Sequence, residues 1–579
     1  MTGWPAAIAV AIAVVLHDPR APAADPKRAL GLLVAVIALG ISIARPPRDR
    51  DRAAIARPAL AFAAFVAWSG LTLAWGVPAG ARDLATWIAA AAIALTFTRA
   101  GVEEARRDTE RAALLAGTVA AAVALSQGIR GARGIFVHGG QGNANWLGLL
   151  LAVTIPLTVG MIARASPTRL STRARLGISI AVVVQIAGLA ASHSRVAWAA
   201  IAVVAPALVI DPWSRLSPAK KPLIAAALIA LAIALPAVIL THSGAPSPPR
   251  VADGEDVPVA VAFQGRTWIW RSSLDAARRA APLGAGQGGF AHAFLDAQGE
   301  RLASLEPRAA SRRFLNATTA HSEWIEVLVD GGPIALGLLL FAFVSAVIHS
   351  LRGAWIAGAA SLITLAVCAS GDSPLRQPGV ALLFGMVLAG AADPAVAASP
   401  PRLARVARIG LLSAAALALA ASLGGWLGSR RLTAAREALP AARRALLASA
   451  ARLDPRSGEI ALERGLFELE EGDAEAAQGA LERSRELLAG VSVHVAIGNA
   501  RARMGQPEAA IDAYRAALRR SPGSFRAHAN LTQPLLALGR IDEAERHLAV
   551  AASLWPGNPR LVEMAEQVRR ARIERATDL

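Results

Sequence analysis

The sequence predicts an all-α protein: a polytopic α-helical membrane domain followed by a C-terminal array of helical repeats. The 579 residues are 54% hydrophobic, with a mean hydropathy of +0.44, and the apolar residues gather in long runs. A soluble core cannot bury so large an apolar fraction, whereas a bilayer solvates about 20 apolar residues per helix. Near residue 430 the composition changes, and Glu and Arg then interleave with Ala and Leu at helical spacing.

Thirteen apolar runs predict the membrane helices of residues 1–428. They are residues 4–16, 29–44, 59–77, 84–98, 112–127, 145–163, 176–192, 196–210, 223–240, 333–350, 354–370, 379–392 and 409–427. Several runs are shorter than about 20 residues, so we expect tilted or partly re-entrant helices and about 12–14 spans in all. The first run has no basic flank and is followed by many others, which argues against a cleaved signal peptide.

Basic residues in the short loops predict the orientation. Alternate loops form one set with 20 Lys and Arg residues and another with 8, and the richer set is expected in the cytoplasm. The N-terminus would then be cytoplasmic, while the long polar loop 241–321 and the C-terminal domain would lie outside. The net charge of +18 arises largely from such loops, so we expect no nucleic-acid partner.

Residues 429–579 contain a sequence period of 33 or 34 residues. Equivalent turns recur at Gly472-Asp473, Gly505-Gln506 and Gly539-Arg540. Small residues let paired helices approach and proline ends the second helix of a pair. The clearest copy carries Gly498, Ala510, Tyr514, Ala517 and Pro522, which resemble the packing positions of a tetratricopeptide repeat. We predict three repeats after a capping helix at about 434–453, continuous with the last span. Their surface would be either a packing scaffold or a site for a protein partner.

Five polar segments are expected together on the outer face: residues 136–146, 192–195, 265–270, 318–324 and 370–378. Arg195 stands in a short turn between two apolar runs, where a charge is costly and usually faces a cavity. It could equally be an anchor that reaches for the membrane surface. Arg266, beside Trp268 and Trp270, is open to the same two interpretations.

His321 precedes the return of the chain to the membrane, and an imidazole there could act as a general base near neutral pH. A metal site is not indicated, because His138, His193 and His292 lack metal-ligand spacing and paired carboxylates. The glycine-rich segment before residue 145 is not a GxxxxGK[ST] loop, so ATP is not implied. We therefore expect no cofactor.

These residues carry a family resemblance. His321-Ser322, followed after nine residues by Gly332, resembles the external histidine motif of the O-antigen ligase and polymerase superfamily. Further blocks resemble that superfamily in the same order: GQGNANWLG, SHSRVAW, GRTWIW with GAGQGGF, and SGDSPLRQP. The resemblance covers about residues 110–390. One departure is Ala335, where the motif usually has Gly, Thr or Tyr.

The resemblance implies a glycosyltransferase that works without metal or ATP. It would move a glycan from an undecaprenyl-diphosphate donor to a lipid or sugar acceptor at the outer face of the inner membrane. Arg195 and Arg266 would grip the diphosphate, and His321 would orient or deprotonate the acceptor hydroxyl; these three are the expected catalytic residues. Guanidinium groups match phosphate oxygens and can neutralise the leaving group. Asn145, Asp372 and Arg376 are further candidates for substrate binding, although Asp372 and Arg376 could instead form an ion pair that closes a loop.

Other functions stay open at this point. Within the same superfamily the protein could be a ligase, an O-antigen or exopolysaccharide polymerase, or a protein O-oligosaccharyltransferase. Outside it, the protein could be a transporter or a non-enzymatic anchor for the repeats. A transporter should show two matching halves, and none is visible in the sequence.

Overall fold

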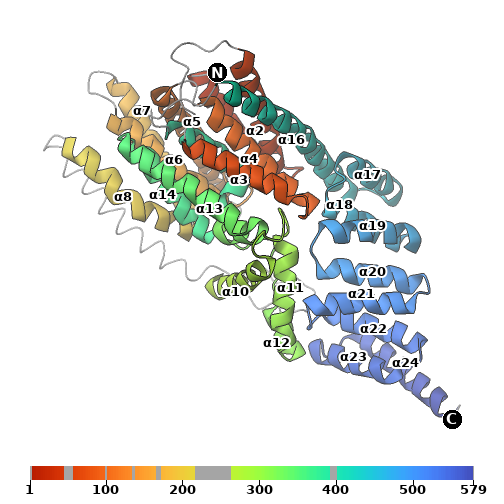
Figure 1. The fold of residues 1–579 in the computed structure, drawn as a ribbon. Coiled ribbons are helices and arrows are strands. Elements are labelled where there is room, and N and C mark those ends of the chain that lie inside the picture. Colours follow the sequence, from red (N-terminus) through yellow and green to blue (C-terminus); the bar gives the residue numbers. More distant parts are fainter. Residues whose placement is uncertain are drawn as a thin grey trace.

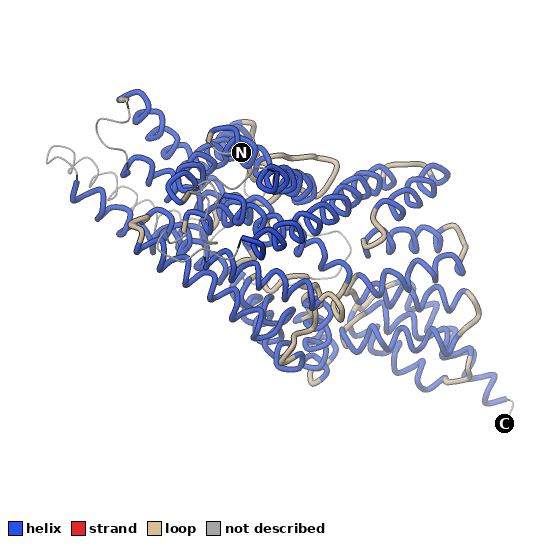
Figure 2. The backbone as a smooth tube through the Cα atoms, turned by 45° about the horizontal axis from the view of Figure 1, so that its top comes forward, coloured by secondary structure: helices blue, strands red, loops and turns tan. Residues whose placement is uncertain are grey.

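The computed structural model describes residues 3–44, 57–97, 101–132, 137–164, 171–215, 262–391 and 401–577. Within these ranges the regular secondary structure is entirely helical. Figure 1 shows a bundle of long helices that contains the N-terminus, joined to a stack of shorter helices that leads away to the C-terminus. Figure 2 shows that tight loops connect most of these helices. The predicted all-α fold is confirmed.

Twelve of the thirteen apolar runs coincide with helices of the bundle, and the run 223–240 lies outside the described residues. The helices are α1 (Trp4–Val15), α2 (Ala24–Ala44), α3 (Arg57–Thr72), α4 (Ala81–Phe97), α5 (Val102–Ile129), α6 (Ala144–Arg164), α7 (Thr172–Ser192), α8 (Arg195–Arg215), α13 (Glu323–Arg352), α14 (Ile356–Gly371), α15 (Pro378–Gly390) and α16 (Pro401–Arg436). Among the described residues, six helices are long and apolar enough to cross a membrane, namely α2, α5, α6, α7, α13 and α16. The protein is therefore a multi-pass membrane protein.

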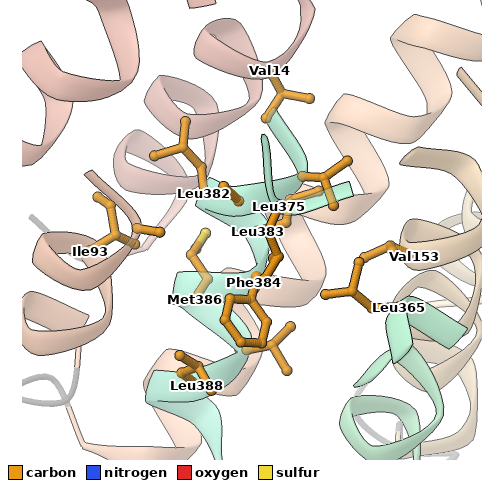
Figure 3. Close-up of a cluster of buried hydrophobic side chains, with 14 of the residues drawn as sticks. Val14, Ile93, Val153, Leu365, Leu375, Leu382, Leu383, Phe384, Met386 and Leu388 are labelled. Carbon is orange, nitrogen blue, oxygen red and sulfur yellow. The ribbon is translucent and has the colours of Figure 1, made fainter. Parts of the chain in front are cut away.

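Helix α15 forms the centre of the bundle, and every one of its residues is buried. A helix that is apolar all round belongs in a core. Figure 3 shows its side chains between Ile93 of α4, Val153 of α6 and Leu365 of α14. Phe384 stacks on Phe343 of α13, with ring centroids 4.9 Å apart.

Three helices of the polar loop form a small layer beside the bundle, which is called the external layer after its predicted side of the membrane: α10 (Ala262–Ala280), α11 (Phe290–Ala303) and α12 (Pro307–Arg313). The glycine-rich link between α10 and α11 packs against the short helix η2 (Pro78–Gly80) and the turn before it. A Cβ atom on Gly286 would lie 2.3 Å from the Cα atom of Gly76, so only glycine permits this approach. The run predicted to span the membrane to residue 77 accordingly ends at Thr72, because the next residues form this turn.

The C-terminal helices are α17 (Pro440–Leu453), α18 (Gly458–Glu470), α19 (Ala474–Leu487), α20 (Val491–Arg503), α21 (Pro507–Arg520), α22 (Phe525–Ala537), α23 (Ile541–Leu554) and α24 (Pro559–Thr577). They contain three helical hairpins, as the repeat spacing predicts. A Cβ atom on Gly498 would lie 2.3 Å from the ring of Tyr514, which explains this pair of repeat positions. The capping helix is not continuous with the last span. Helix α16 ends at Arg436, and Pro440 starts α17 because proline is favoured in the first turn of a new helix.

Candidate functional site

His321 lies between α12 and α13 and is held by its neighbours on both sides. The indole N–H of Trp270 donates to the carbonyl of Ala320 over 2.9 Å. The backbone N–H of Glu323 donates to the carbonyl of Asp372 over 3.0 Å. His321 itself has a left-handed φ of 50°, which is costly for a residue with a side chain and is often found at functional sites. Helix α10 and the turn between α14 and α15 thus fix the backbone on both sides of His321.

The surroundings of His321 favour its neutral form. Partial burial lowers the pKa of the imidazole below its ordinary value of 6.5, and the positive charge of Arg266 acts in the same direction. The nearby Asp372 carboxylate acts in the opposite direction and raises the pKa. A neutral imidazole near pH 7 can accept a proton from a hydroxyl group.

Arg266 lies in the first turns of α10 and reaches the same end of the bundle as His321. This region around His321 is called the polar corner. A Cβ atom on Gly371, the last residue of α14, would lie 3.6 Å from Nη1 of Arg266 and 2.9 Å from Cγ2 of Val196. The guanidinium group therefore lies against the C-terminal end of α14 and near the N-terminal end of α8. The absence of a side chain at Gly371 leaves room for this meeting.

Arg195 is the first residue of α8 and is exposed beside Val196. The turn before it is sharp, because His193 has a left-handed φ of 52°. It also packs tightly on α6, where a Cβ atom on Gly148 would lie 2.4 Å from Cβ of Ser194. The structure therefore places Arg195 at the same end of the bundle as His321 and Arg266.

Asn145 lies in the first turn of α6, one turn before Gly148, and its side chain is exposed. Its backbone N–H donates to Oδ1 of Asn143 over 2.7 Å, which caps the start of the helix. The glycine-rich turn before it is bound to α5, since Oε1 of Gln127 accepts from the backbone N–H groups of His138 and Gly139. Asn145 thus borders the corner from the side of α6.

Arg376 lies deeper and is surrounded by carboxylates. Its Nη2 atom is 3.0 Å from Oδ2 of Asp330, its Nε atom is 3.3 Å from Oε2 of Glu326, and Asp83 also binds it. Glu323 is 3.7 Å away and completes a group of four carboxylates. Arg376 ties η6 (Pro374–Arg376) to α4 and α13.

Asp372 and Arg376 thus face different surroundings. Asp372 acts on His321, and its Oδ1 atom accepts from the backbone N–H of Ser373 over 2.8 Å. The buried cluster around Arg376 also holds the turn between α14 and α15, because the Glu323 carboxylate accepts from the backbone N–H of Leu375 over 2.8 Å.

The carboxylates of this buried cluster were not among the site residues predicted from the sequence. A signal was available, because Glu323, Glu326 and Asp330 follow one another at intervals of three and four residues just before an apolar run. That spacing places acidic side chains on one face of a helix, where they need a cation. Within the described ranges, no group of three His, Cys, Asp or Glu residues is arranged to hold a metal ion.

Two family models match parts of the chain. Residues 180–342 match the family model described as O-Antigen ligase, and residues 501–564 match the one described as Tetratricopeptide repeat. The chain therefore contains one segment that is similar to O-antigen ligases and another that is similar to tetratricopeptide repeats. The resemblance inferred from the sequence is confirmed. The ligase segment contains Arg195, Arg266 and His321, and it indicates a glycosyltransferase of the ligase or polymerase type.

Comparison with solved structures gives matches at low similarity. PilF from Pseudomonas aeruginosa is 17% identical, and the match covers 29% of this chain and 78% of PilF, with a TM-score of 0.24. Tom70 from yeast is 12% identical, with 76% of this chain and 92% of Tom70 covered and the same TM-score of 0.24. Among curated protein sequences, nothing matches the chain.

Proposed function

We propose that the protein transfers a glycan from an undecaprenyl-diphosphate donor to an acceptor hydroxyl group at the outer face of the inner membrane. The observation that carries this proposal is the meeting of His321, Asp372 and Arg266 at one end of the bundle, with Arg195 beside them. A proton acceptor next to guanidinium groups is the arrangement that such a transfer needs. The match to the family model described as O-Antigen ligase supports it, since the matched residues 180–342 include Arg195, Arg266 and His321.

The reaction is a substitution at the anomeric carbon of the glycan. The acceptor oxygen forms a bond to that carbon while the bond from the carbon to the diphosphate oxygen breaks. The acceptor proton passes to His321, and the electron pair of the broken bond stays on the lipid diphosphate. Arg266 and Arg195 would bind the diphosphate and offset the charge that develops on it.

The other candidate residues take supporting roles in this proposal. Asp372 would hold the imidazole of His321 in a productive orientation, and the exposed Asn145 would contact the glycan or the acceptor. Arg376 would act as a positioning residue, since the carboxylates that surround it hold the Asp372 turn in place.

An apolar groove offers a place for the lipid part of the donor. It lies between α13 and α14, has a volume of about 460 Å³, and is lined by Trp324, Phe343, Ser370 and neighbouring aliphatic side chains. Trp324 follows His321 by three residues and Ser370 precedes Asp372 by two, so the groove begins at the polar corner. We infer that the polyprenyl chain lies in this groove while the diphosphate reaches Arg266.

The proposed orientation follows from the basic loops. The polar corner, the external layer and the repeats would face outward, and the end of the bundle that carries Arg106 would face the cytoplasm. Arg106 closes that opposite end through hydrogen bonds to the carbonyl groups of Gly353 and Gly390. ATP is not available outside the inner membrane, so the energy of transfer must come with the lipid donor.

The test is the glycan profile of cells that lack the protein and are complemented with wild type, His321→Ala, Arg266→Ala or Arg195→Ala. We expect each variant to be present at normal levels and inactive. Long glycan left on the lipid carrier identifies a ligase, and single repeat units on the final acceptor identify a polymerase. Glycan missing from proteins alone identifies a protein O-oligosaccharyltransferase. A normal profile with all three variants would refute the proposal.

A further inference from the structure

The repeats are packed against the external layer by direct backbone contact. A Cβ atom on Gly299 of α11 would lie 2.2 Å from the carbonyl oxygen of Arg519, at the end of α21. In the opposite direction, a Cβ atom on Gly523 would lie 2.4 Å from the carbonyl oxygen of Pro307 at the start of α12. Each partner therefore contributes one glycine, and no side chain fits between the two backbones. Figure 1 shows α11 and α12 beside the ends of α21 and α23.

An ion pair reinforces the same contact. The Nε atom of Arg520 donates to Oδ1 of Asp296 on α11 over 2.7 Å, and its Nη1 atom lies 2.6 Å from Nε2 of His494 on α20. The Arg520 side chain is 16% exposed and that of Asp296 is 57% exposed, so the pair is screened by solvent on the side of Asp296. One side chain thus joins two helices of the repeats to α11.

A buried glutamine leads from this contact to the candidate site. Gln298 precedes Gly299 and is fully buried. Its Oε1 atom accepts from the indole N–H of Trp268 over 3.1 Å and from the backbone N–H of Leu315 over 2.9 Å. Trp268 is two residues from Arg266, and both lie on α10. The position of α11 therefore determines the position of the helix that carries Arg266.

The other end of the repeat stack is fixed to the membrane bundle. Helix α16 of the bundle leads into this end of the stack, and two hydrogen bonds hold its C-terminal part within the bundle. The indole N–H of Trp426 donates to Asp18 over 2.7 Å, and the hydroxyl group of Ser429 donates to Asp25 over 2.9 Å. Arg82, in the first turn of α4, binds Asp454 at the end of α17. The stack is therefore anchored at one end to the bundle and at the other to the external layer.

We propose that the repeats are a positioning element of the transferase, which holds α11 and α10 so that Arg266 stays in register with His321. This proposal rests on the proposed function. A module that only recruited a partner would need its open surface and a tether. It would not need a glycine contact with the helix next to the site.

The first test compares two helical glycines. Gly299→Ala places a methyl group against the Arg519 carbonyl oxygen and forces the two parts away from each other, whereas Gly479→Ala on α19 meets nothing within 4 Å. In a purified assay with lipid-linked donor and soluble acceptor, Gly299→Ala should lower kcat by about 100-fold, the effect of a misplacement of about 1 Å at a reacting centre. Gly479→Ala should match wild type. A rise confined to the KM for the acceptor would overturn the proposal in favour of recruitment.

The second test reverses the ion pair. Arg520→Asp and Asp296→Arg should each lower transfer, and the double variant should regain part of it, because the opposite charges then face each other again. This pair decides the question if Gly299→Ala does not fold. Equal activity of the single variants and wild type would overturn the proposal.

Hydrogen–deuterium exchange separates this proposal from the proposed function. Peptides within residues 262–320 should exchange faster in Gly299→Ala and in each single variant than in wild type or Gly479→Ala. If wild type forms no product but exchange rises as expected, the proposed function fails, although the repeats still hold α10 and α11 in place. If wild type is active while exchange and kcat are unchanged in the variants, the positioning role fails alone.

Discussion

At the scale of single residues, His321 of the candidate site combines a constrained backbone with a side chain whose pKa is shifted by its surroundings. Its left-handed φ, its anchored neighbours and its lowered pKa all lie in one short segment. The sequence indicated the residue through its position at the return to the membrane. It could not indicate Asp372 as the group acting on it, because that contact joins segments 51 residues apart in the chain.

The pKa shift of His321 predicts the pH dependence of transfer. Burial lowers its pKa below 6.5, so the neutral base is present at pH 7 and is lost as the pH falls through the lowered value. Asp372 raises this pKa, and Asp372→Asn should therefore move the acid limb of the kcat/KM profile to lower pH. Measurement of kcat/KM from pH 4 to 8 for both proteins checks this shift. A shift to higher pH in the variant would contradict it.

Arg266 should not tolerate lysine. Lysine keeps the charge but loses the planar pair of donors that fits two phosphate oxygens. We expect Arg266→Lys to lower transfer about tenfold or more, since one hydrogen bond to a charged group contributes roughly 1.5–3 kcal/mol. Arg271→Lys, at an exposed position on the same helix, is the matched control and should leave the rate unchanged. Equal rates for both variants would show that Arg266 acts only through its charge.

Arg376 should matter first for stability. Arg376→Met would leave Asp83, Glu323, Glu326 and Asp330 without their cation, and an uncompensated buried charge costs roughly 3–5 kcal/mol. The thermal unfolding midpoint in detergent should fall clearly. Arg572→Met is the control, because Arg572 pairs with Asp542 and Glu545 at an exposed site where ion pairs contribute little.

At the scale of elements, hydropathy predicted where helices lie but not where each one starts. The apolar part of α13 starts at Pro333, as predicted, after a break at Gly332, whose φ of 69° is not helical. The helical turns from Glu323 to this break were not predicted, and Arg376 neutralises their acidic side chains. The pattern of one segment cannot reveal a cation that arrives from another. The break before α17 was equally hidden in the apolar pattern, although Pro440 signals it.

The groove between α13 and α14 predicts a dependence on lipid chain length. Ala366→Phe would fill part of the groove, whereas Val183→Phe on the exposed face of α7 would not. With a long-chain donor, Ala366→Phe should raise KM about tenfold, since two methylene groups that lose their contact cost about 0.8 kcal/mol each. With a short-chain donor, both variants should resemble wild type. The same KM for long and short donors in wild type would show that the polyprenyl chain does not bind in the groove.

At the scale of the whole molecule, the sequence predicted the two architectural parts and the gathering of polar segments at one end, but not the packing of one part on the other. The contact between the repeats and the external layer depends on Gly299 and Gly523. Gly299 lies outside the repeats, and Gly523 recurs as Gly490 and Gly557 at the repeat period, so the sequence does not mark either glycine as a contact residue. Backbone-to-backbone contacts leave no pattern of apolar side chains, so only the three-dimensional arrangement shows them.

The orientation of the whole molecule is open to a direct measurement. The single cysteine, Cys368, is fully buried, so an introduced cysteine reports its own side of the membrane. Ser553→Cys in the repeats and Ser171→Cys before α7 are exposed positions on parts predicted to lie on opposite sides. A membrane-impermeant maleimide should label Ser553→Cys in spheroplasts and Ser171→Cys only after lysis. The reverse pattern would invert the protein in the membrane and place the corner around His321 in the cytoplasm. Labelling of both residues from the same side would contradict the predicted topology. The charge difference between alternate loops and the contacts of the repeats with the external layer both require the repeats and the loop before α7 to lie on opposite sides of the membrane.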